Sequence, residues 1–384
     1  MIPNVISATL AALFLLTPPL LPAEDNNTGF KPLFNGTNFD GWVRTNTPES
    51  TWSFKDGMLI CTGKPIGEIR TERMYQNFIM EVEWRHMKPR GNAGIFIWAD
   101  DITAKGVPFH RGIEVQVLEN AYGNTRGYTT HGDIFPIHGA KMTPINGRGG
   151  SRAFPTEERS KPGPEWNHYR IECQDGNISL AVNGKIVTQG KECWPKKGYI
   201  CLESEGGIVH YRNAKIKVLP DTPIDKKDIA IANRDYRSIY SGLDLSGWKT
   251  AKANAGHWKS NDWILSFSGK STASDKALVS TESFGDFRFL MDFRLKSDGS
   301  LALIQLRGKT GFPLVFSKSK GTVVKNGQWN RLEGTVTGNR ITATLNGKQL
   351  AVDFDGRLPK EGPIRIAPSG PIDFANLYVR GVAR

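Results

Sequence analysis

The sequence predicts an all-β protein built from two β-sandwich domains in tandem. Short runs rich in Val, Ile and aromatic residues recur between turn signals such as Asp-Gly and Asn-Gly-Lys, a pattern typical of antiparallel strands. No amphipathic helical period of useful length appears. The 41 glycines and 22 prolines are spread along the 384 residues, as in a turn-rich β protein. Two antiparallel sheets packed as a sandwich or jelly roll fit this composition.

The tandem arrangement follows from motifs that occur twice. FNGTNFDGW ends at Trp42 and YSGLDLSGW ends at Trp248. EWNHYRIECQDGNISLAVNGK, residues 165–185, matches QWNRLEGTVTGNRITATLNGK, residues 328–348. The period is far too long for a solenoid repeat, so the pattern indicates one duplicated domain.

The N-terminus resembles a secretory leader. The apolar run Val5–Leu16 is too short to span a bilayer but has the length of a signal-peptide core, and Ala23 is a suitable last residue before cleavage. We therefore expect residues 1–23 to be a signal peptide and the protein to be exported to the periplasm or beyond. No other segment has the length and apolar character of a membrane span.

The repeat and the composition divide the remaining chain. We expect a first sandwich domain over residues 29–219, a linker rich in Pro and charged residues over 220–234, and a degenerate second copy over 235–384.

The charge and the cysteines argue against two other classes of protein. The formal net charge is +12, but its basic residues are scattered and form no stripe interleaved with aromatic residues, so we expect no nucleic-acid partner. The four cysteines do not have the spacing of a zinc site and leave three disulfide connectivities open. Cys61 and Cys173 fall in predicted strands, where they fit as small buried residues.

The first copy is longer than the second, and the difference points to function. About 45 more residues separate Gly94 from Trp166 than separate Ala302, its apparent equivalent, from Trp329. The added segment includes RGIEVQVLEN, residues 111–120, and the loop after it. Loops added to a rigid scaffold are where function tends to lie.

The strand in this segment has two unlike faces. Ile113, Val115 and Val117 share an apolar face, whereas Glu114 and Gln116 share the opposite face. The polar face is either an ordinary solvated surface or the floor of a ligand site.

Histidine and carboxylate residues flank this strand. His110 precedes it, and the loop of residues 128–140 holds His131, Asp133 and His138. Such groups serve as general acids and bases or as metal ligands, but they are equally common as turn formers and surface residues. The pattern alone leaves these roles open, and a divalent cation with them.

Two further polar residues are candidates for ligand binding. Asn92 lies between two glycines in GNAGIF, and Arg70 lies in GEIRTER; either side chain could hold hydroxyl or anionic groups or be structural. Trp42, Trp52 and Trp166 recur in the second copy, so we expect them to be core residues and not sugar-stacking platforms.

Five motifs in the first copy resemble a known family. F-N-G-x-x-x-x-G-W, W-x-x-x-D-G-x-L, G-N-A-G-I-F, G-I-E-V-Q-V-L-E-N and E-W-N-x-Y-x-I occur in the order seen in 3-keto-disaccharide hydrolase domains, over roughly residues 29–219. The resemblance implies a concanavalin-like jelly roll in both copies, export, and action on an oxidised sugar or glycan that carries a ketone at C3. The family often has Asp at the position of Glu119.

The resemblance also implies a reaction. A ketone at C3 acidifies the hydrogen on C2, so a base can remove it, the C1 substituent can leave, and water can then add. In this scheme Glu114 is the base or a metal-holding carboxylate, and His131 or His138 is the acid or a ligand. A divalent ion, if bound, polarises the ketone. The other candidates for contact with substrate are Arg70, Asn92, His110, Gln116, Glu119 and Asp133. The alternative is a non-catalytic, lectin-like carbohydrate-binding protein, because this fold serves that function too.

Overall fold

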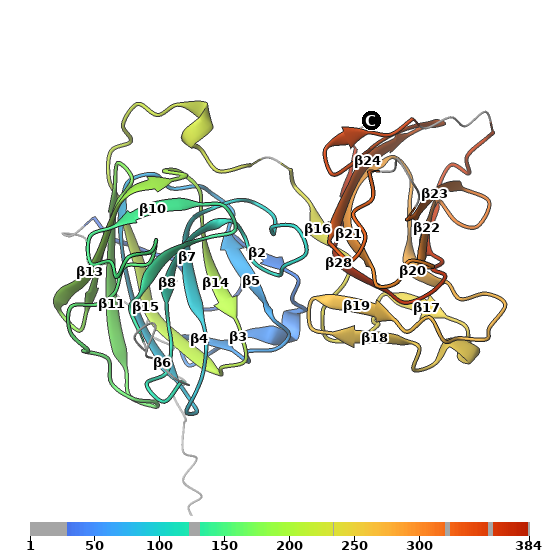
Figure 1. Ribbon diagram of the computed structural model, residues 1–384. Helices are drawn as coiled ribbons and strands as arrows, with labels where there is room; N and C mark the ends of the chain where they lie inside the picture. Colours follow the sequence, from blue (N-terminus) through green and yellow to red (C-terminus); the bar gives the residue numbers. More distant parts are fainter. Residues whose placement is uncertain (1–28, 123–130, 233, 319–322, 352–355, 383–384) are drawn as a thin grey trace, which may run out of the picture.

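The computed structural model describes residues 29–122, 131–232, 234–318, 323–351 and 356–382, and forms two β-sandwiches (Figure 1). Apart from three short 3-10 helices, η1 (Glu49–Thr51), η2 (Lys226–Asp228) and η3 (Lys252–Asn254), every regular element in these ranges is a strand or an isolated bridge. The prediction of an all-β tandem is therefore confirmed. No helix in the described ranges has the length and apolarity to cross a membrane. The leader segment, residues 1–23, lies outside the described residues.

The larger sheet of the first domain has nine antiparallel strands. Their order is β10-β13-β12-β11-β6-β15-β4-β3, with β1 paired to β15. The strands are β1 (Lys31–Pro32), β3 (Trp52–Lys55), β4 (Met58–Cys61), β6 (Phe78–His86), β10 (Lys141–Pro144), β11 (Asn167–Gln174), β12 (Asn177–Val182), β13 (Lys185–Trp194) and β15 (Val209–Val218).

The smaller sheet of the first domain carries the polar residues of interest. Its order is β2-β5-β14-β7-β8-β9, and all of its pairs are antiparallel. The strands are β2 (Trp42–Thr45), β5 (Gly67–Thr71), β14 (Tyr199–Ser204), β7 (Gly94–Ala99), β8 (Gly112–Gln116) and β9 (Ile134–Ile137).

The second domain repeats this plan with fewer strands. Its two sheets have the orders β18-β19-β28-β21-β24-β25-β26, with β16 on β28, and β17-β20-β27-β22-β23. The strands are β16 (Arg237–Ser238), β17 (Trp248–Thr250), β18 (Trp258–Asn261), β19 (Ile264–Phe267), β20 (Leu278–Phe284), β21 (Phe287–Leu295), β22 (Leu301–Leu306), β23 (Phe312–Ser317), β24 (Asn330–Thr337), β25 (Arg340–Leu345), β26 (Lys348–Gln349), β27 (Gly362–Ile366) and β28 (Ile372–Gly381).

Each domain has its own hydrophobic core between its two sheets. In β6 buried and half-buried residues alternate along the whole strand, because one side of the strand faces the core and the other faces outward. Trp42 and Trp52 are buried in the first core, and Trp248 and Trp258 are buried in the second, as the repeat predicts.

Trp166 is the exception, and its assignment to the core was wrong. The residue is half-buried just before β11, and the guanidinium groups of Arg85 and Arg212 lie 4.4 and 4.0 Å from its ring centroids. An indole offers its face to cations, so this tryptophan packs against two arginines instead of entering the apolar interior.

The motif around Trp166 recurs for a hydrogen-bonding reason. The Asn167 side chain accepts one hydrogen bond from the backbone of the preceding loop and donates another to it. The side-chain amide of Asn183 donates a hydrogen bond to the Asn167 side-chain oxygen. Asn330 and Asn346 make the same three contacts in the second domain. Both copies of the motif therefore tie a loop to a hairpin turn.

The sheet orders correct one expectation about the added segment. The strand within residues 111–120 is β8, and its counterpart in the second domain is β23. β8 pairs with β7, the neighbour of β14, and β23 pairs with β22, the neighbour of β27. The strand is thus shared between the copies. What the first domain adds is a longer β7–β8 loop, residues 100–111 against 307–311, and the segment that contains β9 and β10.

The longer β7–β8 loop contacts the second domain. The Gly106 amide donates to Asp292 Oδ2 at 2.8 Å, and the Asn376 amide donates to two carbonyls of the loop at 2.9 and 3.1 Å. Arg331 pairs with Asp292 through two hydrogen bonds and donates a further one to the loop. The outer face of β21, β24 and β28 therefore holds residues 100–111 in place.

Candidate active site

Glu114 and Gln116 lie on the outer face of β8, opposite the core residues Ile113 and Val115, as the alternation predicts. Only 7% of Glu114 and 6% of Gln116 is exposed to solvent. This face is therefore enclosed, and the interpretation of it as an ordinary solvated surface does not hold.

Two more carboxylates share this face, and the sequence did not single them out. Glu203 lies on β14 and Glu205 follows it, with Glu203 2% exposed and Glu205 half-buried. β14 pairs with β7, which in turn pairs with β8, so Glu203 and Glu114 meet across Gly94.

Gly94 lets the two carboxyl groups approach each other. A Cβ atom on this residue would lie 2.9 Å from Glu114 Oε1 and 3.0 Å from Glu203 Oε2, which is closer than side chains normally come. Since both oxygens lie within about 3 Å of one point, they are no more than about 6 Å apart. The absence of a side chain at Gly94, the second glycine of GNAGIF, thus leaves room for both carboxyl groups.

Glu114, Glu203 and Glu205 are called the carboxylate cluster below. The three carboxyl groups cannot all be ionised at neutral pH. Burial, and then the charge of Glu205, raises the pKa of Glu114 to about 8. Burial raises the pKa of Glu205 to about 7 and that of Glu203 well above its usual range. A hydrogen bond between Glu203 and Glu205 raises the pKa of the former and lowers that of the latter. Near neutrality the cluster therefore holds both protonated and ionised carboxyl groups.

Asn92 orients Glu205, the half-buried member of the cluster. Gln116 Nε2 donates to Asn92 Oδ1 at 2.9 Å, and Asn92 Nδ2 donates to the Glu205 carboxylate. This chain of amides fixes the position of the carboxyl group that reaches solvent.

Arg152 places a positive charge beside the cluster. It forms an ion pair of 3.0 Å with the fully buried Asp133, and its guanidinium lies 3.4 Å from the centroid of the Phe135 ring. Phe135 is the cross-strand partner of Glu114, and the charge of Arg152 lowers the pKa of Glu114 against the larger effect of burial. Asp133 thus belongs to the site by holding this arginine.

The two predicted catalytic histidines lie on either side of β9 in the chain. His131 is 1% exposed; the amide of Ser160 donates to its Nε2 at 3.2 Å, and its Nδ1 lies 2.5 Å from the Ser160 hydroxyl. Burial lowers its pKa to about 4, so the ring is neutral. His138 lies beyond the other end of β9, exposed, with its ring stacked on Phe109. The strand between them keeps the imidazoles apart.

Two further candidates are engaged by backbone groups. Arg70 donates to the carbonyls of Asp101 and Thr71 and lies over the Tyr199 ring at 4.5 Å. Glu119 accepts three backbone amide hydrogen bonds, and these lower its pKa although burial acts in the opposite direction. Backbone groups of the first domain thus hold both side chains in place.

His110 lies in a separate cluster. Its imidazole pairs with Glu68, and Cys201 Sγ lies 3.7 Å from its Nδ1. Both side chains of the pair are fully buried.

The second domain lacks every one of these carboxylates. In the first domain Leu202 on β14 pairs with Ile69 on β5 and with Ile95 on β7. In the second domain Ile366 on β27 lies in the same way between β20 and β22. Leu202 and Ile366 are therefore equivalent positions, and the other matches follow by counting along the paired strands. On this register Gly94 matches Leu303 and not Ala302. The matching positions are Ala277 for Glu68, Pro313 for Glu114, Ala367 for Glu203 and Ser369 for Glu205. The fold therefore forms without these acids.

Residues 29–217 match the sequence model of the 3-keto-alpha-glucoside-1,2-lyase-like domain. The N-terminal domain is similar to this family over these residues. The family is carbohydrate-active, and the predicted resemblance is confirmed for this part of the chain. The comparison with curated proteins returned no match.

Solved structures similar to this chain cover about half of it. A protein from Parabacteroides distasonis ATCC 8503, provisionally described as a glycosyl hydrolase, is 24% identical with a TM-score of 0.41, over 52% of this chain and 99% of its own. A carbohydrate-binding module from Bacillus subtilis is 12% identical with a TM-score of 0.34, over 47% and 98%. A β-glucanase from Bacillus licheniformis is 14% identical with a TM-score of 0.33, over 50% and 97%.

In the lyase-like domain the carboxylate cluster combines four features. It is enclosed, it opens to solvent at Glu205, it holds protons near neutrality, and it has no equivalent in the second domain. Strongly perturbed carboxyl groups on one face of a sheet are an arrangement expected of acid–base chemistry.

Proposed function

We propose that the lyase-like domain cleaves the glycosidic bond of glycosides that carry a ketone at C3, by elimination followed by addition of water. The family supports the substrate class. The observation that carries the proposal is the carboxylate cluster of Glu114, Glu203 and Glu205 on one enclosed face.

The cluster matches the proton transfers of this reaction. An ionised carboxylate takes the acidic hydrogen from C2, and the electron pair moves into an enolate with the C3 oxygen. The enolate then expels the C1 substituent, whose oxygen takes a proton from a protonated carboxyl group. Addition of water across the C1–C2 double bond returns the free 3-keto sugar. One cluster that holds both protonated and ionised groups near pH 7 serves as base and as acid.

The positions of the members suggest how the work is divided. Glu205 is the member that reaches solvent, so it is the one that meets the sugar, held there by Asn92. Glu203 and Glu114 lie behind it and exchange protons with it. Arg152, which is 26% exposed at its side chain, is the nearby cation that can stabilise the enolate oxygen.

The test uses a chromogenic 3-keto-glucoside and its unoxidised counterpart with the full chain. We expect cleavage of the 3-keto compound alone, with a primary isotope effect when C2 carries deuterium. Glu205→Gln and Glu114→Gln are expected to lose about 10²–10⁴-fold in kcat/KM. Glu165→Gln is the matched control, because that carboxylate is 59% exposed and lies outside the cluster.

Three results would count against the proposal. Cleavage of the unoxidised glycoside at a similar rate would favour an ordinary glycosidase, which needs no ketone. Binding of the 3-keto sugar without any cleavage would favour the lectin-like alternative. Full activity in both cluster variants would remove the carboxylates from the mechanism.

A further inference from the structure

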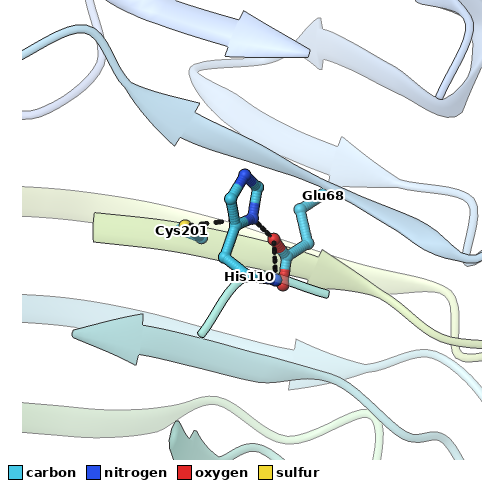
Figure 2. A group of neighbouring side chains, drawn as sticks. All are labelled: Glu68, His110 and Cys201. Atoms are coloured by element: carbon cyan, nitrogen blue, oxygen red, sulfur yellow. Dashed lines mark hydrogen bonds and ion pairs between the residues drawn. The ribbon is translucent and has the colours of Figure 1, made fainter. Parts of the chain in front are cut away.

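We propose that Glu68, His110 and Cys201 form a binding site for a divalent cation of the zinc class. One ligand atom from each residue lies within 4.8 Å of the other two. Figure 2 shows the imidazole of His110 meeting the carboxylate of Glu68, with the thiol of Cys201 beside them. The site goes beyond the proposed function, because none of these residues belongs to the carboxylate cluster.

The fold brings the three residues together from distant parts of the chain. Glu68 on β5 and Cys201 on β14 lie on neighbouring strands, where Glu68 pairs with Glu203 and Cys201 with Arg70. Both side chains therefore point to the outer face of the smaller sheet. His110 reaches the same place from the end of the β7–β8 loop, where it forms an isolated bridge with Thr103.

The three side chains are buried but incompletely satisfied without an ion. All three residues are 0% exposed. Within the described part of the chain, Glu68 Oε1 has no hydrogen-bond partner, and neither does His110 Nε2, the ring nitrogen that does not face Cys201. A buried polar atom without a partner costs about 1–3 kcal/mol, and a buried carboxylate needs a compensating charge.

A divalent cation resolves this arrangement. Glu68 can bind with both oxygens, which also gives Oε1 a partner, while His110 and Cys201 supply one nitrogen and one sulfur. Four donor atoms of mixed oxygen, nitrogen and sulfur type suit Zn²⁺ or Co²⁺. Mg²⁺ and Ca²⁺ prefer oxygen ligands and fit poorly here.

The second domain again provides an internal comparison. Ala277 stands at the position of Glu68, Arg365 stands at that of Cys201, and the loop of residues 307–311 is shorter than its counterpart that carries His110. All three donors are thus present in the first domain and absent from the equivalent positions of the second domain, which has the same fold.

The burial of the site indicates a structural ion. No donor is exposed, so a sugar has no access to the ion, and a closed coordination sphere is typical of structural zinc. The ion would tie one end of residues 100–111 to the smaller sheet, while the second domain holds the middle of the same loop.

The experiment measures metal content and does not depend on activity. The full chain is stripped with a chelator, incubated with Zn²⁺ or Co²⁺, desalted and analysed for bound metal and absorption. We expect about one ion per chain, a higher Tm in its presence, and a thiolate-to-cobalt charge-transfer band in the near ultraviolet with Co²⁺.

Cys201→Ser tests the assignment against Cys193→Ser, which alters another fully buried cysteine, on β13. The Cys201 variant is expected to lose the charge-transfer band and most of the bound metal, whereas the Cys193 variant keeps both. Folding of each metal-free variant is checked by circular dichroism. Failure of the wild-type chain to retain either ion would overturn the proposal, and so would an unchanged band in Cys201→Ser.

Discussion

Replacing Glu114 by Gln should stabilise the protein while it lowers activity, and the gain in stability should depend on pH. The amide has nearly the same shape but never ionises. In the folded protein burial raises the pKa of Glu114 from 4.5 to about 8. Between these values the unfolded chain releases a proton that the folded chain keeps, so the wild-type protein loses stability as pH rises.

The expected magnitude follows from the two pKa values. Each pH unit between 4.5 and about 8 is worth about 1.4 kcal/mol, so the loss approaches roughly 5 kcal/mol above pH 8 and vanishes below pH 4.5. Proton exchange with Glu203 and Glu205 spreads this cost over the cluster, which makes roughly 5 kcal/mol an upper limit for one substitution.

The assay is urea unfolding of wild type and Glu114→Gln at pH 5 and pH 8. The variant should exceed the wild type by a few kcal/mol at pH 8 and by much less at pH 5. Glu165→Gln, which alters an exposed carboxylate, should show no such pH dependence. A difference between Glu114→Gln and wild type that is the same at both pH values would refute the reasoning.

Three further predictions test other parts of the molecule. Gly94→Ala should lower kcat about 10–100-fold with the fold retained, because the new methyl group displaces two carboxyl groups of the cluster, while Gly150→Ala, which contacts nothing, should be neutral in the same kinetic assay. Asn376→Ala should lower the unfolding free energy by about 1–3 kcal/mol and speed hydrogen exchange in residues 100–111, because two loop carbonyls lose their donor; unchanged exchange would contradict this. The pH profile of kcat/KM should show an inflection near 7 that Glu205→Gln removes, and an inflection that persists in the variant would assign it to another group.

The sequence predicted the features that are local or repeated. The strand alternation placed Glu114 and Gln116 on the face opposite Ile113, and the duplicated motifs identified both sandwiches. These predictions succeed because strand period and loop-fixing hydrogen bonds depend on neighbouring residues.

The composition of the site could not be predicted in the same way. Glu203 and Glu205 come close to Glu114 only because β14 lies between β5 and β7, and this pairing over about 100 residues leaves no local signal. Their alternation in E-S-E, with Ala367 and Ser369 at the matching positions, was the available clue. His131 and His138 are close in sequence, but β9 runs between them, and a short sequence separation alone does not show where each imidazole points.

The hydrogen bonds between the two domains join segments that are made at different times during synthesis. Residues 100–111 are made first, and Asn376, which binds their carbonyls, follows about 270 residues later. The N-terminal domain has its own hydrophobic core, whereas residues 100–111 also depend on hydrogen bonds with the C-terminal domain. The second domain, which has none of the cluster's acids, thus holds a loop of the first domain in position. Separating the two domains would leave residues 100–111 without these hydrogen bonds.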